Sequence, residues 1–178
     1  MPRLFTGLEI PSETALMLSM LQGGLKGARW IDPENYHITL RFIGDIDDRT
    51  ADEVVAALDR IRRDPIEVRL DGLGSFGTGK PHAVWARVQP TDELAELQAE
   101  QERILQRLHL PAERRKYTPH VTLARCRTSS NEEVAKWLSE RGAFQAPPFM
   151  VGRFVLFSAK ASVGGGPYLV EEAYPLAA

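Results

Sequence analysis

The sequence has almost no cysteine and no long apolar run. Cys126 is the only cysteine among 178 residues, which excludes an internal disulfide and a metal knuckle of the CxxC type. No segment approaches the roughly 18 consecutive apolar residues that a membrane-spanning helix needs. The first residues also lack the basic stretch and long apolar stretch of a secretory signal. These absences predict a soluble, cytoplasmic protein without a membrane anchor.

The sequence also lacks an excess of either charge, because 22 basic and 24 acidic residues give a formal net charge of −2. This balance argues against a protein that wraps long nucleic acid over a broad basic face, although a small anion pocket is compatible with it. With 43% apolar and 26% charged residues, we expect one compact domain over residues 1–178, most simply a monomer. The glycine-rich segment 72–80 matches neither a phosphate-binding loop nor a dinucleotide fingerprint. We predict a flexible loop there and no nucleotide cofactor.

Apolar periodicity predicts alternating strands and helices along the chain. Ser12 and the T-x-x-E and S-x-x-E pairs at 50–53 and 130–133 predict helix starts. The short strand 28–31 and the strand 36–43, separated by turn-forming residues, suggest a hairpin. The predicted strands are 3–10, 28–31, 36–43, 66–73, 83–88, 117–125, 149–157 and 168–173, and the third predicted helix covers 91–108.

Two short motifs repeat in the two halves of the chain. Residues 37–40 read His-Ile-Thr-Leu and residues 120–123 read His-Val-Thr-Leu. Each motif is followed by a capping box, a helix and an apolar strand, and the strands that begin at Ile66 and Phe149 lie at the same spacing after the motifs. This order predicts an α+β fold of two pseudo-symmetric lobes, each an antiparallel sheet with outer helices, around a central cleft.

The spacing of each motif places its polar residues on one face of a strand. Side chains alternate along a strand, so His37 and Thr39 share a face, as do His120 and Thr122, while the intervening apolar residues enter the core. A histidine can give or take a proton near neutral pH, and a threonine hydroxyl can donate to a phosphoryl oxygen. Two opposed histidines therefore suit an in-line displacement at phosphorus. The motifs themselves do not order the two roles, and neither offers the third ligand that a metal site would require.

These motifs carry a resemblance to a known family. The chain resembles the two-histidine (2H) phosphoesterase superfamily, in its branch of RNA 2',3'-cyclic phosphodiesterases, historically called 2'-5' RNA ligases. The similarity covers nearly the whole chain and is carried by residues 29–30, 37–44 and 115–125. One departure is Tyr117, where the family usually has phenylalanine. The resemblance implies metal-free and cofactor-free hydrolysis of terminal 2',3'-cyclic phosphates on RNA to 2'-phosphates, with His37 as the proton donor to the leaving oxygen and His120 as the acceptor from water.

The resemblance also implies that Thr39 and Thr122 hold the phosphate and that Arg125 contacts it. Strict alternation of side chains predicts otherwise for Arg125. It lies five residues after His120 and should point to the opposite face of the strand from His120, unless a bulge redirects it. Arg41 lies on the expected face by the same rule. We retain both arginines as candidate anion-binding residues, the first from the family and the second from geometry. Trp30 and Tyr117 are candidates for stacking on a nucleobase.

Three other functions are compatible with the same residues. Within enzymes, the alternatives are 2'-5' RNA joining or cleavage and hydrolysis of another cyclic nucleotide. The alternative of a different class is a non-catalytic module that binds RNA ends. The presence of a histidine in both motifs favours an enzyme, because binding alone would tolerate arginine or lysine at these positions.

Overall fold

The computed structural model describes residues 3–159 and 166–177. Its strands are β1 (Arg3–Glu9), β2 (Ala28–Trp30), β3 (His37–Asp45), β4 (Ile66–Val68), β5 (Leu70–Phe76), β6 (Ala83–Val88), β7 (His120–Cys126), β8 (Phe149–Val151), β9 (Arg153–Ala159) and β10 (Tyr168–Pro175). Its helices are α1 (Ser12–Ser19), the short 3-10 helix η1 (Pro33–Asn35), α2 (Asp48–Leu58), α3 (Asp92–Arg107) and α4 (Asn131–Arg141). None of these helices is long and apolar enough to cross a membrane.

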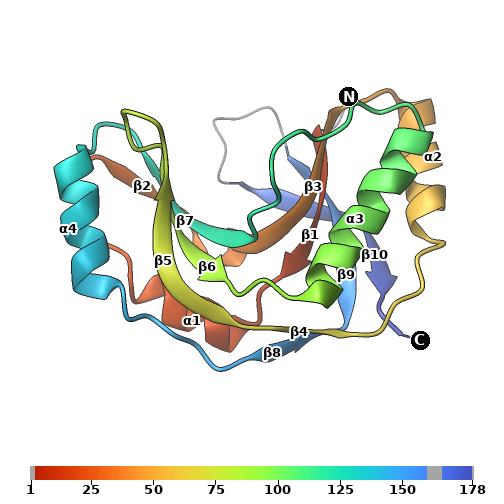
Figure 1. The fold of residues 1–178 in the computed structure, drawn as a ribbon. Helices are drawn as coiled ribbons and strands as arrows, with labels where there is room; N and C mark the ends of the chain where they lie inside the picture. Colours follow the sequence, from red (N-terminus) through yellow and green to blue (C-terminus); the bar gives the residue numbers. More distant parts are fainter. Residues whose placement is uncertain (1–2, 160–165, 178) are drawn as a thin grey trace.

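One curved antiparallel sheet runs through both halves of the chain (Figure 1). Its strand order is β10-β9-β1-β3-β7-β6-β5, and β2 pairs with β7 beside this path. The two motif-bearing strands, β3 and β7, meet at a single residue pair, Ile38 opposite Val121. Each of these residues directly follows the histidine of its motif, so the two motifs lie beside each other at the junction of the lobes.

The predicted internal repeat is visible in a second pairing. β4 and β8 begin at Ile66 and Phe149, the two strand starts expected from the repeat, and they pair with each other in a two-stranded sheet. Equivalent strands of the two halves therefore meet twice, once at the motifs and once at these short strands. The prediction of an α+β fold with two pseudo-symmetric lobes is confirmed, with the refinement that β3 and β7 join the two lobe sheets into one.

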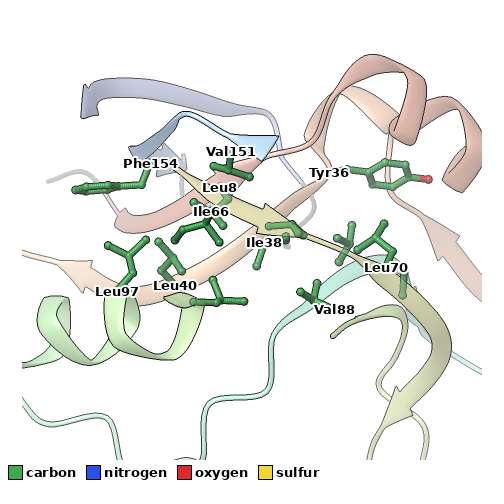
Figure 2. Close-up of a cluster of buried hydrophobic side chains, with 14 of the residues drawn as sticks. Leu8, Tyr36, Ile38, Leu40, Ile66, Leu70, Val88, Leu97, Val151 and Phe154 are labelled. Atoms are coloured by element: carbon green, nitrogen blue, oxygen red, sulfur yellow. The ribbon is translucent and has the colours of Figure 1, made fainter. Parts of the chain in front are cut away.

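Apolar side chains from both lobes form the main core (Figure 2). Ile38 and Val121 are fully buried in it, as the alternation within the motifs predicts. Helix α3 lies along the lobe that contains β3 (Figure 1), and its buried stripe includes Leu97 and the polar Gln101. The oxygen of the Gln101 side chain accepts a hydrogen bond of 2.6 Å from the hydroxyl of Thr6, whereas its Nε2 is buried without a partner among the described residues.

Two predicted helix starts differ from the structure, and one is confirmed. Asp47 rather than Thr50 caps α2, because the Asp47 carboxylate, three residues upstream, accepts from the Thr50 amide at 2.7 Å. At α1 the capping position is Pro11, and Ser12 is already helical. The capping box of Ser130 and Glu133 is present with both of its hydrogen bonds.

The predicted hairpin and glycine-rich loop are also partly wrong. β2 pairs with β7 instead of β3, because η1 redirects the chain between the two strands. The glycine-rich segment continues strand β5 as far as Phe76. Gly72, with φ of 87°, lies where the register shifts instead of ending the strand. Gly74 stays extended because the ring of Trp85 on the neighbouring strand occupies the space above it.

Candidate active site

A β-bulge in each motif strand decides which side chains reach the cleft. Opposite β1, Thr39 pairs with Gly7 and the next paired residue on β3 is Arg41, so Leu40 has no partner. Opposite β6, Thr122 pairs with Trp85 and the next paired residue on β7 is Ala124. Both strands consequently show the same burial pattern, with two consecutive buried residues after the threonine. The alternation of faces reverses beyond each bulge.

The bulges reverse the geometric expectation for the two arginines. Arg125 is brought to the histidine side, where it is exposed and lines a cavity with His120 and Thr39. Arg41 is turned toward the interior and is only 6% exposed. Strict alternation favoured Arg41 over Arg125, but the bulge adds one residue between the motif and the arginine, and Arg125 is the more exposed of the two residues in this cavity lining.

Arg41 is occupied by structural contacts. Its guanidinium forms an ion pair with Glu102 of α3 and donates to the backbone carbonyls of Phe42 and Pro111. Partial burial opposes ionisation of Glu102, but hydrogen bonds from Arg41, Gln106 and the Glu113 amide outweigh it and lower the Glu102 pKa to about 2. We therefore remove Arg41 from the candidate anion-binding residues and assign it to the docking of α3 on β3.

The two histidines are oriented by matching backbone contacts. His37 Nδ1 lies 2.9 Å from the carbonyl oxygen of Asn35, and His120 Nδ1 lies 2.7 Å from that of Thr118. A carbonyl can only accept, so each Nδ1 carries the proton and each neutral ring presents an unprotonated Nε2. Nε2 of His37 lies 3.1 Å from the hydroxyl of Thr39, which donates to it in this tautomer. Both rings thus offer a proton-accepting atom at the site.

Burial lowers the pKa of both histidines. The pKa of His37 falls to about 4, chiefly through burial, while the Asn35 carbonyl opposes the fall and the charges of His120 and Arg125 add to it. The pKa of His120 is lowered by burial and by Arg125, against the Thr118 carbonyl. Arg125 therefore lies within electrostatic reach of both imidazoles. A site with two neutral histidines and one guanidinium is suited to binding an anion. The negative charge of that anion would raise the pKa of a neighbouring histidine and favour its protonation.

Cavities lie on both sides of the pair. One of about 500 Å³ is lined by Thr39, His120 and Arg125 together with the basic side chains of Arg115 and Lys116. Another of about 520 Å³ is lined by His37, with other residues of α1, η1 and β10. Arg41 also lies in the lining of the first cavity, so the predicted site residues other than Thr122 are divided between the two cavities. Thr122 is half-buried beside Trp85 and belongs to neither lining.

The two aromatic candidates differ in position. The Tyr117 ring lines the cavity with His120, and its hydroxyl donates to the Thr39 carbonyl at 2.9 Å. Burial raises the pKa of this hydroxyl, so it stays protonated as a donor. Trp30 instead packs against Trp137 of α4, with ring centroids 5.7 Å apart. The stacking hypothesis is therefore kept for Tyr117 only. Among the described residues, no cluster of three histidine, cysteine or carboxylate side chains could hold a metal ion.

Sequence reasoning missed a set of rings around the histidines. Phe5, Phe157 and Tyr168 surround His37, with ring centroids within 5.6 Å. Phe76 and Trp85 flank His120 in the same way. These residues lie on five different strands outside the motifs, so no local pattern in the sequence connects them to the histidines.

Comparison with known proteins decides the family. The family model of the 2'-5' RNA ligase superfamily matches residues 26–162, which include both motifs and Arg125. The chain belongs to the 2'-5' RNA ligase superfamily. Its relatives include an RNA 2',3'-cyclic phosphodiesterase of Aeropyrum pernix, 38% identical over 115 residues, or 63% of this chain. The aligned part spans just under two thirds of that relative, 65% of its length.

Other members of the superfamily align over more of the chain. An RNA 2',3'-cyclic phosphodiesterase of Aquifex aeolicus is 28% identical over 83% of this chain and 81% of its own length. Among solved structures, a Thermus thermophilus protein superposes with a TM-score of 0.81 at 22% identity, covering 98% of this chain and 97% of its own. E. coli LigT complexed with 3'-AMP gives 0.76 at 22% identity, with 99% of both chains covered. These two structures establish the fold.

Proposed function

We propose that the protein is an RNA 2',3'-cyclic phosphodiesterase that opens a terminal cyclic phosphate to a 2'-phosphate, as a cytoplasmic monomer whose two lobes form one catalytic domain. The observation that carries this proposal is the pairing of two backbone-oriented histidines, each with an unprotonated Nε2, beside Arg125. The curated superfamily relatives support the substrate, because they bear this activity in their names.

The reaction is an in-line displacement at phosphorus. His120 Nε2 accepts a proton from the attacking water, and the new P–O bond forms opposite the departing ribose O3'. Protonated His37 donates its Nε2 proton to O3' as the P–O3' bond breaks, which leaves the phosphate on O2'. Each proton transfer contributes about 10²- to 10⁴-fold. Thr39, Thr122 and the Arg125 guanidinium donate to the non-bridging oxygens, where charge must be held.

The negative charge of bound phosphate favours the protonated form of His37 that the mechanism needs, and the proton itself comes from solvent. With a pKa of about 4, on the order of one free molecule in a thousand carries the His37 imidazolium at pH 7. An anionic phosphate about 4 Å away, at the effective dielectric of a protein surface, is worth about 4 kcal/mol, enough to raise a pKa by about three. Bound phosphate therefore raises the pKa of His37 back toward its usual range. Its protonation in turn releases the Thr39 hydroxyl from Nε2 and allows it to donate to the phosphate.

The activity is tested with a short RNA that ends in a 2',3'-cyclic phosphate, incubated with the protein and EDTA. We expect hydrolysis, with all product carrying its phosphate on the 2' oxygen, because O3' is the leaving group beside His37. Chromatography against synthetic 2'- and 3'-phosphorylated standards identifies the product. Activity that disappears with EDTA would contradict the metal-free mechanism, a 3'-phosphate would contradict the orientation, and no turnover would contradict the proposed function.

A further inference from the structure

The ring contacts of the two histidines repeat with nearly the same geometry in the two lobes. The Tyr168 ring lies 4.9 Å from His37 at an interplanar angle of 81°, and the Phe76 ring lies 4.8 Å from His120 at 85°. A second ring contacts each histidine at a tilt. Phe157 lies 5.6 Å from His37 at 54°, and Trp85 lies 5.6 Å from His120 at 53°. The two histidines thus have one edge-on and one tilted ring in common, and His37 has a further tilted neighbour, Phe5, at 5.0 Å.

Each ring pair comes from two adjacent strands outside the motifs. Phe76 and Trp85 lie on β5 and β6, and Phe157 and Tyr168 lie on β9 and β10. These strand pairs form the two opposite edges of the sheet (Figure 1). Phe76 and Phe157 lie 39 and 37 residues after the motif histidine of their own half, and Trp85 and Tyr168 both lie 48 residues after it. The internal repeat therefore places one ring pair in each half, and each pair contacts the histidine of the opposite half.

A glycine makes room for the tilted ring beside His120, because a Cβ atom on Gly74 would lie 2.4 Å from the Trp85 ring. At Gly7 a Cβ atom would meet the Ile38 carbonyl oxygen first, at 2.7 Å, and the Phe157 ring at 3.1 Å. The Trp85 placement also has a cost, because its indole N–H is buried without a hydrogen-bond partner among the described residues. A buried donor without a partner destabilises the fold. Phenylalanine would avoid this cost, so stability alone does not account for the large ring.

We propose that these two ring pairs, Phe76 with Trp85 and Phe157 with Tyr168, are positioning residues that fix the planes of the two catalytic imidazoles. The hydrogen bond at Nδ1 anchors one atom of each ring but leaves it free to swing about that bond. Apolar rings on either side block the swing and keep Nε2 aimed at the reacting oxygens. A misplacement of about 1 Å can cost 10²-fold in rate. The catalytic consequence rests on the proposed function, whereas the effect on the histidines does not.

The test replaces the edge-on ring of each pair by an aliphatic side chain. We expect Phe76→Leu and Tyr168→Leu to lower kcat about 10- to 100-fold, with KM changed less than about 3-fold, because misaligned histidines slow proton transfer more than phosphate binding. Phe76→Tyr and Tyr168→Phe restore a ring and should keep kcat within about 3-fold of the original. Unchanged kcat in both leucine variants, or no rescue by the conservative ones, would overturn the proposal.

NMR titration of the imidazoles gives a second readout that does not depend on turnover. Phe76→Leu should raise the pKa of His120 toward its usual range and leave that of His37 in place, and Tyr168→Leu should do the reverse, because each ring shields one histidine. Phe42→Leu, which removes a 49% exposed ring from the same cavity, should change neither pKa. Unchanged or equal shifts would overturn the proposal. An original protein without turnover would overturn the proposed function, and this titration would still decide the positioning role.

Discussion

His120→Ala is expected to lower kcat for an RNA 2',3'-cyclic phosphate by about 10²- to 10⁴-fold, with little change in affinity for a 2'-phosphate product. The reason is that His120 acts on the attacking water, while the contacts that hold the phosphate come from other side chains. Thr39 and Arg125 line the same cavity as His120 and remain in the variant. His37→Ala should lose a comparable factor in kcat, since it removes the proton for the leaving oxygen.

Single-turnover rates and calorimetric affinities for a nucleoside 2'-monophosphate separate the two effects. His109→Asn is the matched control, because His109 is exposed at the end of α3 with φ of 67°, a conformation that asparagine tolerates. It should behave as the original protein does. Equal losses of affinity and turnover in His120→Ala would instead favour a module that only binds RNA ends.

Arg41→Met and Arg125→Met are expected to have opposite consequences. Arg41→Met leaves Glu102 without its ion-pair partner while Glu102 is only 15% exposed. We expect the free energy of unfolding to fall by about 2–4 kcal/mol, somewhat below the range for fully buried pairs because water reaches Glu102. For a domain of this size the melting temperature should fall by about 5–15 °C. Below that temperature, kcat/KM should stay within about 3-fold of the original, because the Arg41 guanidinium is already engaged by Glu102 and two backbone carbonyls.

Arg125→Met should leave the melting temperature almost unchanged, since its side chain is exposed, and lower kcat/KM about 10- to 100-fold. This range corresponds to the loss of charge-assisted hydrogen bonds to the phosphate, about 1.5–3 kcal/mol. Thermal melts and initial rates on both variants provide the comparison. Lost activity in a stable Arg41→Met protein, or full activity in Arg125→Met, would contradict the assignment of Arg41 to structure and Arg125 to phosphate binding.

The placement of these arginines shows where sequence reasoning stops. The H-x-T-x spacing correctly put His37 and Thr39 on the cleft face, because alternation holds along an uninterrupted strand. The bulges at Leu40 and Leu123 depend on pairing with β1 and β6, which are distant in the sequence. No local sequence pattern predicts these bulges. The family resemblance pointed to Arg125, which is the arginine that the bulge leaves exposed beside His120.

The internal repeat predicted where strands begin but not which strands pair. The repeat gave the starts of β4 and β8 because both halves share one order of elements. It did not reveal that Ile66 and Phe149 would begin strands that pair with each other, since the repeat does not specify contacts between halves. The rings of Phe76 and Tyr168 were missed for the same reason. They meet the histidines only when the sheet brings its outer strands over the motifs.

The pH dependence of kcat/KM in the original protein and in the two histidine variants tests two-histidine catalysis most directly. We expect a bell centred below pH 6.5 for the original, because burial lowers both pKa values in the free protein. The base His120 must be neutral, so its protonation causes the acidic limb; the acid His37 must be protonated, so its deprotonation causes the alkaline limb. His120→Ala should therefore lose only the acidic limb and His37→Ala only the alkaline one. If both variants keep the bell, or both lose the same limb, the two histidines are not the acid and the base.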